Sequence, residues 1–331
     1  MIKVIIPAAG LGTRLKPFTH TTPKALLPVA GKPIISHIVD QLAGQGLSDF
    51  VFVVGYMGEK IEEYIRANYA ISASFAYQEE LLGLGYAIHL GLSFVSDDDT
   101  VVILLGDTIT EVDLSKIFDI GGNVIGVHLV SDPRRFGVVT VKAGKIIEFV
   151  EKPEHPKSNL GIVGLYLVRD TSLLRRSLRE IIETNKKTRG EFQLTDALSL
   201  MLSSGAEFFP YEISGWFDCG SPETLLETNR HILTTLDSSP AIEGSVVIPP
   251  CFISPDAVVK SSIIGPYVSV AAGSSVEESI VRNSILAEAV HLKHCLLESS
   301  ILGTGAEFVG RFYRLNMGDS SQVILDWGKE R

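Results

Sequence analysis

The sequence predicts an α/β domain followed by a solenoid of short parallel strands. Over residues 1–236, short aliphatic segments alternate with segments of helical periodicity. That alternation is typical of a mixed, mainly parallel sheet covered by helices on both faces. Over residues 241–315, aliphatic residues recur every five or six positions. This period fits neither a helix nor a strand pair and favours a hexapeptide solenoid, with a generic β domain as the alternative because the period is imperfect.

The elements of the first domain follow from this alternation in chain order. Strands are predicted at 2–7, 50–54, 73–77, 101–105, 123–129, 136–141, 146–150, 162–168 and 206–211. Helices are predicted at 34–45, 58–68, 84–93, 171–184, 193–204 and 222–235. Ligands of open α/β sheets bind at the carboxyl ends of strands. We therefore expect the loops after 2–7 and 101–105 to meet the turn near Trp216.

The solenoid is predicted to bury one aliphatic side chain per short strand. The inward positions would be Ile253, Val259, Ile264, Val270, Val276, Val281, Leu286 and Leu292. At about 18 residues a coil, the segment is long enough for roughly four coils. Ser238, Ser239 and Pro240 mark the boundary between the domains, and residues 316–331 are predicted to form a C-terminal cap or tail.

Composition restricts the classes of protein that the chain can belong to. The net charge is −10, which argues against nonspecific binding to nucleic acid. There is neither an apolar run long enough for a membrane span nor a signal peptide, so we expect no membrane partner. The three cysteines are far apart and lack metal-site spacing, which fits a reducing, cytoplasmic location.

A glycine-bearing turn after the first predicted strand is the strongest local signal. Residues 8–13 read A-A-G-L-G-T, and Arg14 and Lys24 add positive charge beside them. Backbone N–H groups of such a turn can form a concavity that binds anions, so the segment predicts a polyphosphate site. A plain strand-to-helix loop is the alternative. A third glycine is missing at Leu15, which excludes the dinucleotide fingerprint, and no P-loop sequence occurs.

Two aspartates follow apolar segments and could bind a metal ion. Asp107 ends the run V-V-I-L-L-G-D, and Asp218 lies in W-F-D-C-G. Carboxylates at strand ends are suitable ligands for Mg²⁺. The alternatives are a turn aspartate for Asp107 and a helix cap for Asp218, although Ser221 is better placed to cap the helix that begins near Pro222.

The order of these motifs resembles one enzyme family. G-x-G-T-R-x-x-P-x-T over residues 10–19 and P-K-x-L-L-P-V-x-x-K-P over 23–33 look like the opening signature of sugar-1-phosphate nucleotidylyltransferases. The resemblance covers about the first 235 residues. It implies a Rossmann-like three-layer αβα domain, and the segment behind it resembles the left-handed parallel β-helix that follows many such domains.

The resemblance also implies a role for particular residues. Asp107 and Asp218 would hold Mg²⁺, Arg14 would bind the leaving pyrophosphate, Lys24 would face the α-phosphate, and Lys152 would orient the sugar phosphate. The remaining nucleotide-binding residues would be Ala8, Ala9, Gly10, Gly12, Thr13, Gln78 and Gly83. The remaining residues of the sugar-phosphate site would be Gly137, Glu151, Ile162, Tyr166, Arg189 and Trp216.

The expected reaction is transfer of a nucleotidyl group from a nucleoside triphosphate to a sugar 1-phosphate, with release of pyrophosphate. Ala9 and Ala25 depart from the usual thymidylyltransferase pattern, so both thymine and uracil remain alternatives for the base. The first choice is dTTP with glucose 1-phosphate, and the second is UTP with the same sugar. A regulatory subunit and a bifunctional acetyltransferase are further alternatives. For His291 and His294 in the solenoid we expect an outward structural role. We also expect a homo-oligomer.

Overall fold

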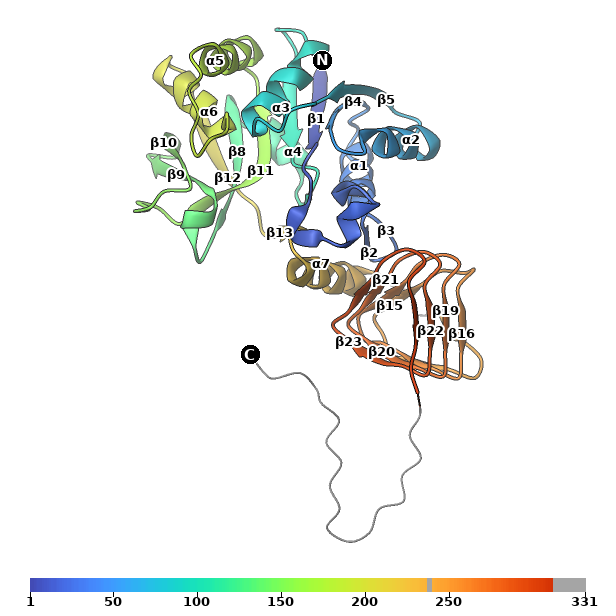
Figure 1. The fold of residues 1–331 in the computed structure, drawn as a ribbon. Coiled ribbons are helices and arrows are strands. Elements are labelled where there is room, and N and C mark those ends of the chain that lie inside the picture. The colour runs from blue at the N-terminus through green and yellow to red at the C-terminus, as the bar shows by residue number, and fades with distance from the viewer. Residues whose placement is uncertain (237–239, 312–331) are drawn as a thin grey trace.

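A nine-stranded mixed sheet forms the centre of the first domain in the computed structural model, which describes residues 1–236 and 240–311 (Figure 1). Its strands are β1 (Ile2–Ala8), β4 (Asp49–Val54), β5 (Ser72–Tyr77), β6 (Thr100–Leu104), β8 (Asn123–Leu129), β9 (Gly137–Lys142), β10 (Lys145–Glu151), β11 (Leu160–Val168) and β12 (Phe208–Glu212). Strands β5, β4, β1 and β6 run parallel. Strand β11 is antiparallel to β6 and β8, and β12 pairs parallel with β8.

Helices cover both faces of this sheet, as the sequence predicts. On one face lie α1 (Ile34–Gly44) and α2 (Gly58–Asn68), which pack with Val4 and Ile6 of β1. On the other face, α3 (Leu84–Gly91), α5 (Thr171–Glu183) and α6 (Leu194–Ser203) pack with Ile5. These three β1 residues are fully buried, because successive side chains of a strand point into opposite helical layers. The three-layer prediction is confirmed.

Several short elements were not predicted. They are β2 (Pro28–Val29), β3 (Lys32–Pro33), β7 (Thr108–Glu111), α4 (Leu114–Phe118) and β13 (Gly215–Asp218). Strands β7 and β13 form an antiparallel ribbon, so Trp216 lies in a strand where the sequence predicted a turn. Helix α7 (Pro222–Thr235) begins after Ser221, whose side chain accepts a hydrogen bond from the backbone N–H of Thr224. Ser221 is thus the helix cap, as expected, and Asp218 is not.

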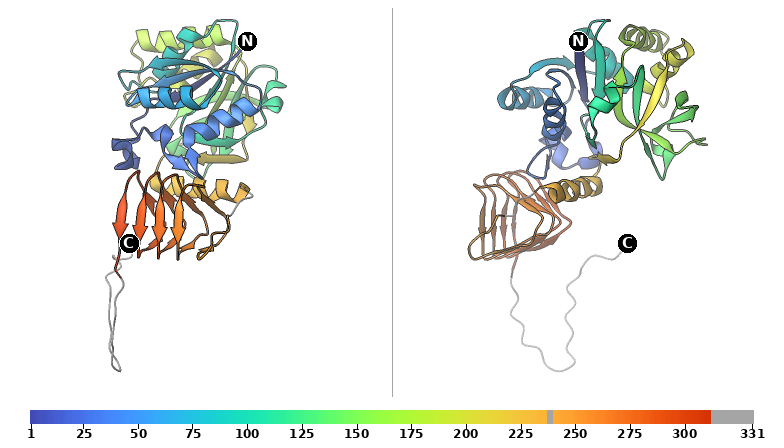
Figure 2. Two further views of the ribbon diagram at one scale, coloured as in Figure 1. Left: turned by 90° about the vertical axis from the view of Figure 1, so that its right-hand side faces the viewer. Right: turned by 180° about the vertical axis from the view of Figure 1, so that it is seen from behind.

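The second part is a left-handed β-helix of three parallel sheets with four strands each in the described residues (Figures 1 and 2). The first sheet has β14 (Val246–Val247), β17 (Ile263–Ile264), β20 (Ile280–Arg282) and β23 (Leu296–Glu298). The second has β15 (Cys251–Ile253), β18 (Val268–Val270), β21 (Ile285–Leu286) and β24 (Ile301–Leu302). The third has β16 (Val258–Lys260), β19 (Ser275–Glu277), β22 (His291–Lys293) and β25 (Glu307–Val309).

The coils of the β-helix are shorter than expected. Val246 pairs with Ile263 in the early coils, and His291 pairs with Glu307 in the last, so a coil takes 17 and then 16 residues where about 18 were predicted. All eight predicted inward positions are buried. The imperfect period in the sequence therefore reflects tighter corners and not a different fold.

The histidines of the β-helix contact polar neighbours on adjacent coils. His291 is exposed and its Nδ1 lies 2.8 Å from Ser275 Oγ. The Nε2 atom of His294 lies 2.8 Å from a carboxylate oxygen of Glu278. Both contacts join a strand or corner to the equivalent position of the preceding coil, which is what the expected structural role requires.

A buried asparagine links the two parts where α7 lies against the β-helix (Figure 2). Asn229 is fully buried, and its Oδ1 accepts hydrogen bonds from Ala30 N and Ser269 Oγ, each at 2.9 Å. Its Nδ2 donates to the Tyr267 carbonyl at 3.3 Å. One side chain on α7 thus holds the loop before α1 and a coil of the β-helix together.

The remaining predictions concern the cysteines, membrane-spanning segments and the ends of the domains. The three cysteines are free and buried. No helix in the described part of the chain is long and apolar enough to cross a membrane. The predicted boundary at Ser238 and Ser239 and the predicted tail at 316–331 lie outside the described residues.

Candidate active site

The turn after β1 is held in shape by a threonine further along the signature. Gly12 has a φ of 60°, and its carbonyl accepts a hydrogen bond from Thr19 Oγ1 at 2.9 Å. A Cβ at Gly12 would lie 2.8 Å from Thr19 Cγ2, so only glycine fits. The P-x-T part of the signature therefore supports the turn that carries Thr13 and Arg14, which begin a short 3₁₀ helix, η1 (Thr13–Leu15).

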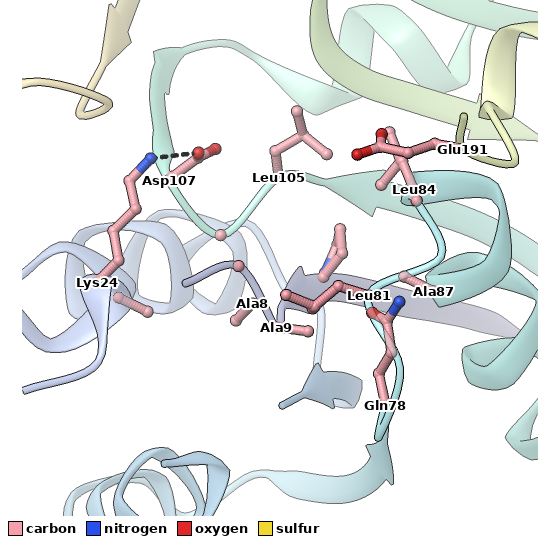
Figure 3. A pocket seen from close by; sticks show the side chains of 15 residues that line it. Ala8, Ala9, Lys24, Gln78, Leu81, Leu84, Ala87, Leu105, Asp107 and Glu191 are labelled. Atoms are coloured by element: carbon pink, nitrogen blue, oxygen red, sulfur yellow. Dashed lines mark hydrogen bonds and ion pairs between the residues drawn. The ribbon is translucent and has the colours of Figure 1, made fainter. Parts of the chain in front are cut away.

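The end of β6 and the end of β1 lie close together. Gly106 donates its N–H to the Pro7 carbonyl at 3.0 Å, and a Cβ at Gly106 would come within 2.8 Å of that oxygen. This approach places Asp107 beside the glycine-bearing turn after β1. Lys24, from the 3₁₀ helix η3 (Lys24–Leu26), pairs with Asp107, with Nζ 2.5 Å from Oδ2 (Figure 3).

The ribbon of β7 and β13 places the second aspartate next to the first. Asp218 is directly opposite Thr108, and the Cys219 N–H donates to the Asp107 carbonyl at 3.0 Å. Loops from β1, β6 and β13 thus converge, as predicted from the sheet class. The convergence depends on a four-residue strand, β7, that has no clear signal in the sequence.

The two carboxyl groups have opposite pKa shifts. Burial opposes ionisation of Asp107, but the Lys24 charge and its hydrogen bond outweigh burial and hold the pKa below its ordinary value. Burial and the neighbouring Asp107 charge raise the pKa of Asp218, although Lys24, Arg14 and Arg135 oppose that shift. Two carboxylates that repel each other in this way form a suitable pair of ligands for a divalent cation.

The two carboxylates can hold a divalent cation only if a bound ligand supplies the other oxygen atoms of its coordination shell. The described residues contain no group of three or more His, Cys, Asp or Glu side chains arranged to hold a metal ion. Mg²⁺ in phosphoryl-transfer sites typically has one or two protein carboxylates, with phosphate oxygens and water in the other positions. Asp107 and Asp218 supply that number.

Arg14, in η1 directly after the glycine-bearing turn, reaches the same point. A Cβ on Gly220 would lie 2.7 Å from Arg14 Nη2 and 2.8 Å from both carboxylate oxygens of Asp218. The glycine after β13 therefore leaves space in which these two charged groups lie. Arg14 and Lys24 approach the aspartates from the N-terminal signature, and both can bind the phosphates of one ligand.

A cavity of about 340 Å³ opens beside these charges (Figure 3). Its lining includes seven predicted residues: Ala8, Ala9, Gly10, Lys24, Gln78, Gly83 and Asp107. Gly12, Thr13 and Arg14 belong to the adjoining turn and do not line it. Apolar walls come from Ala25, Leu81, Leu84, Ala87 and Leu105. The size and lining suit a flat base with its sugar.

The contacts of Gln78 and Gly83 explain why these two residue types stand at the cavity. Gln78 Nε2 donates to the Glu80 carbonyl at 3.0 Å, which fixes the amide, and Oε1 makes no hydrogen bond to another described residue. A Cβ at Gly83, with its φ of 107°, would lie 2.7 Å from the Phe192 carbonyl. Close backbone approach therefore requires this glycine. Glu191 also lines the cavity and was not among the predicted site residues.

Four of the predicted sugar-phosphate residues, Gly137, Glu151, Lys152 and Arg189, meet where β9 begins and β10 ends. Thr195 Oγ1 donates to Glu151 Oε2 at 2.9 Å, and a Cβ on Gly137 would lie 3.1 Å from the same oxygen. Lys152 has a φ of 42°, and its carbonyl accepts a hydrogen bond from Arg189 Nη2 at 2.8 Å. The Lys152 side chain is thus presented from a fixed, left-handed backbone.

The predicted lining residues of the sugar pocket are more buried. Ile162 and Tyr166 lie on β11 in the core of the domain, where they are 7% and 4% exposed. Burial, with a smaller effect of Glu151, raises the pKa of Tyr166. The indole of Trp216 packs edge-on against Phe136 with ring centroids 5.2 Å apart. Its Nε1 is buried and has no hydrogen-bond partner in residues 1–236 or 240–311.

Fold and site together define an enzyme of nucleotidyl transfer. The sequence profile described as "Nucleotidyl transferase" matches residues 3–235, and the chain belongs to this family. The β-helix lies beyond the matched region.

Individual relatives extend the comparison. The low-salt glycan biosynthesis nucleotidyltransferase Agl11 of Haloferax volcanii is 31% identical over 98% of this chain and all of its own. A glucose-1-phosphate thymidylyltransferase of Streptomyces griseus is 29% identical over 98% of this chain and 99% of its own. The bifunctional protein GlmU of Methanococcus maripaludis is 36% identical, but the match covers 74% of this chain and 58% of that protein.

A solved structure, that of a UDP-glucose pyrophosphorylase with UDP-glucose, superposes with a TM-score of 0.62 at 26% identity. It covers 71% of this chain and all of its own.

Proposed function

We propose that this enzyme transfers a nucleotidyl group from dTTP to glucose 1-phosphate, with Mg²⁺ as cofactor and pyrophosphate as the second product. The observation that carries the proposal is the position of Asp107 and Asp218, adjacent across β7 and β13, with Arg14 and Lys24 on one side. Lys152, directly after β10, would bind the second phosphorylated substrate. This arrangement provides for two phosphorylated substrates that meet at one cation.

The reaction needs no protein nucleophile. An ionised oxygen of the sugar phosphate attacks the α-phosphorus in line and forms a new P–O bond. The bond between the α-phosphorus and the bridging oxygen breaks, and its electron pair leaves with pyrophosphate. Arg14 would bind the leaving group, Lys24 would face the reacting phosphorus, and Lys152 would orient the attacking phosphate. Mg²⁺ held by the aspartates would neutralise phosphate charge when bound.

The base is proposed from the cavity. Gln78 Oε1 can accept a hydrogen bond from the N3–H of thymine or uracil, so it does not separate the two. The apolar wall of Leu81, Leu84 and Ala87 favours the extra methyl group of thymine. The full-length Streptomyces relative supports the same choice. UTP is the second candidate, because the UDP-glucose pyrophosphorylase structure shares the fold of this domain.

In this proposal residues 1–236 carry out catalysis and the β-helix carries out no reaction. The enzyme would act in the cytoplasm as a homo-oligomer.

The direct test is release of pyrophosphate with a panel of nucleoside triphosphates and sugar 1-phosphates in the presence of Mg²⁺. The expected best pair is dTTP with glucose 1-phosphate. Release with no pair would end the proposal.

Replacement of one aspartate tests the assigned site. Asp107→Asn keeps the shape of the side chain and removes the charge, so we expect nearly complete loss of turnover in a folded protein. Asp40→Asn is the control, because Asp40 also pairs with a lysine, Lys32, but on the surface of α1. Wild-type rates in Asp107→Asn would refute the assignment.

A further inference from the structure

We infer that Arg135 is a further binding residue of this site, one that contacts the phosphate of the sugar 1-phosphate. The inference rests on the proposed function and adds to it a residue that the sequence motifs did not single out.

Arg135 and its neighbour Arg134 have different surroundings. Both lie in the short 3₁₀ helix η5 (Pro133–Arg135). Arg134 turns back onto Asp132, with Nε 2.7 Å and Nη2 3.2 Å from its two carboxylate oxygens. Arg135 is exposed and forms no ion pair within the described ranges. Only the second arginine therefore has a charge that is free to meet a ligand.

Aromatic packing places Arg135 on the same side of the ribbon as Asp218. Its guanidinium carbon lies 5.8 Å from the centre of the Phe136 ring, and that ring packs edge-on against Trp216. Trp216 is two residues before Asp218 on β13, so the two side chains share one face of the ribbon.

Backbone contacts tie the same segment to the sugar-phosphate side. The carbonyl of Phe136, which follows Arg135, accepts a hydrogen bond from the Lys152 N–H at 3.0 Å. The next residue, Gly137, lies against Glu151. Arg135 thus stands between the strand end that carries Lys152 and the ribbon that carries Asp218.

The negative charge of the sugar phosphate explains why Lys152 alone is not sufficient to bind it. A sugar phosphate brings up to two negative charges, whereas Lys152 lies 3.4 Å from Glu151 and is partly neutralised by it. A guanidinium remains charged at all relevant pH values and can donate two parallel hydrogen bonds to one phosphate. Arg14 and Lys24 lie on the side of the turn after β1, so Arg135 would join Lys152 and the predicted Arg189 as a cation for the attacking substrate.

Steady-state kinetics with each substrate varied in turn test this inference. Arg135→Ala is expected to raise the KM for glucose 1-phosphate about 10- to 100-fold, the cost of a lost charge-assisted hydrogen bond. The KM for dTTP, and for pyrophosphate in the reverse direction, is expected to stay within about twofold. Arg134→Ala is the matched control and should resemble wild type. Arg135→Lys should recover part of the loss, because the charge remains.

Calorimetric titration of each folded variant with glucose 1-phosphate measures binding without turnover. Weaker binding by Arg135→Ala than by Arg134→Ala supports the inference even if another nucleotide is the true substrate. Equal KM values in the two alanine variants, or a rise confined to the KM for dTTP, would overturn it. Absence of pyrophosphate release by the wild type would instead overturn the proposed function.

Discussion

A methyl group added at Gly220 would separate Arg14 from Asp218 without changing any charge. The new Cβ would lie 2.7 Å from Arg14 Nη2 and 2.8 Å from the Asp218 oxygens, where ordinary contact begins at 3.4 Å. Each group must therefore move by about 0.6 Å. Since a displacement of about 1 Å in a catalytic group can cost about 100-fold, we expect Gly220→Ala to lower kcat/KM roughly tenfold.

The fold should survive this substitution. The atoms in conflict are the far ends of flexible side chains, and the backbone at Gly220 does not have a positive φ. We therefore expect a melting temperature close to that of wild type. Gly121→Ala is the control, because a Cβ there meets nothing within 4 Å.

The assay is continuous detection of pyrophosphate for wild type and both variants, together with thermal unfolding. Full activity in a folded Gly220→Ala protein would show that the arginine and the aspartate do not act from these positions. A large fall in melting temperature would show that the backbone absorbs the methyl group, which would contradict the argument from flexible side chains.

Two further predictions concern stability. Burial lowers the pKa of His37 from 6.5 to about 4. As the pH falls below 6.5, this histidine is therefore protonated in the unfolded chain but stays neutral in the folded one. The free energy of unfolding of wild type should fall by about 2 kcal/mol by pH 5 because of this group. Denaturant titrations at pH 7 and pH 5 should show a smaller loss in His37→Gln, while the exposed His155→Gln should behave as wild type. Asn229→Ala leaves buried partners unsatisfied at the junction with the β-helix and should cost roughly 2–4 kcal/mol, more than Ser269→Ala, which removes one of the same bonds. Equal unfolding midpoints for Asn229→Ala and Ser269→Ala would contradict the assigned role of the asparagine.

Much of the fold could be predicted from short segments of the sequence, because the pattern of buried side chains within a segment determines its secondary structure. The aliphatic run at β1 must be buried on both faces, and its two sets of side chains enter the two helical layers as expected. The inward positions of the β-helix were predictable for the same reason, since each stacks on its equivalent in the next coil. The number of residues in a coil could not be predicted, because the geometry of each corner depends on packing against the neighbouring coils and no local sequence pattern records it.

Two glycines of the site differ in whether nearby or distant residues explain them. Gly12 is required by its own φ and by Thr19, a residue within the same signature, so a short segment contains the whole explanation. Gly83 was expected among the nucleotide-binding residues, and the structure shows why a glycine stands there, namely the close approach of Phe192 from a distant segment. Only the folded chain brings those two segments together.

The sequence by itself determined the layered α/β class of this protein and pointed to the groups of the candidate site, which are the glycine-bearing turn after β1, Arg14, Lys24 and the two aspartates. It could do so because these features depend on neighbouring residues and on the period of burial. The tertiary structure alone decided that Asp107 pairs with Lys24, that β7 and β13 bring Asp218 beside it, and that Arg135 rather than Arg134 remains exposed without an ion pair within residues 1–236 and 240–311. Such contacts follow from strand order and register, which long-range packing sets and no local pattern records.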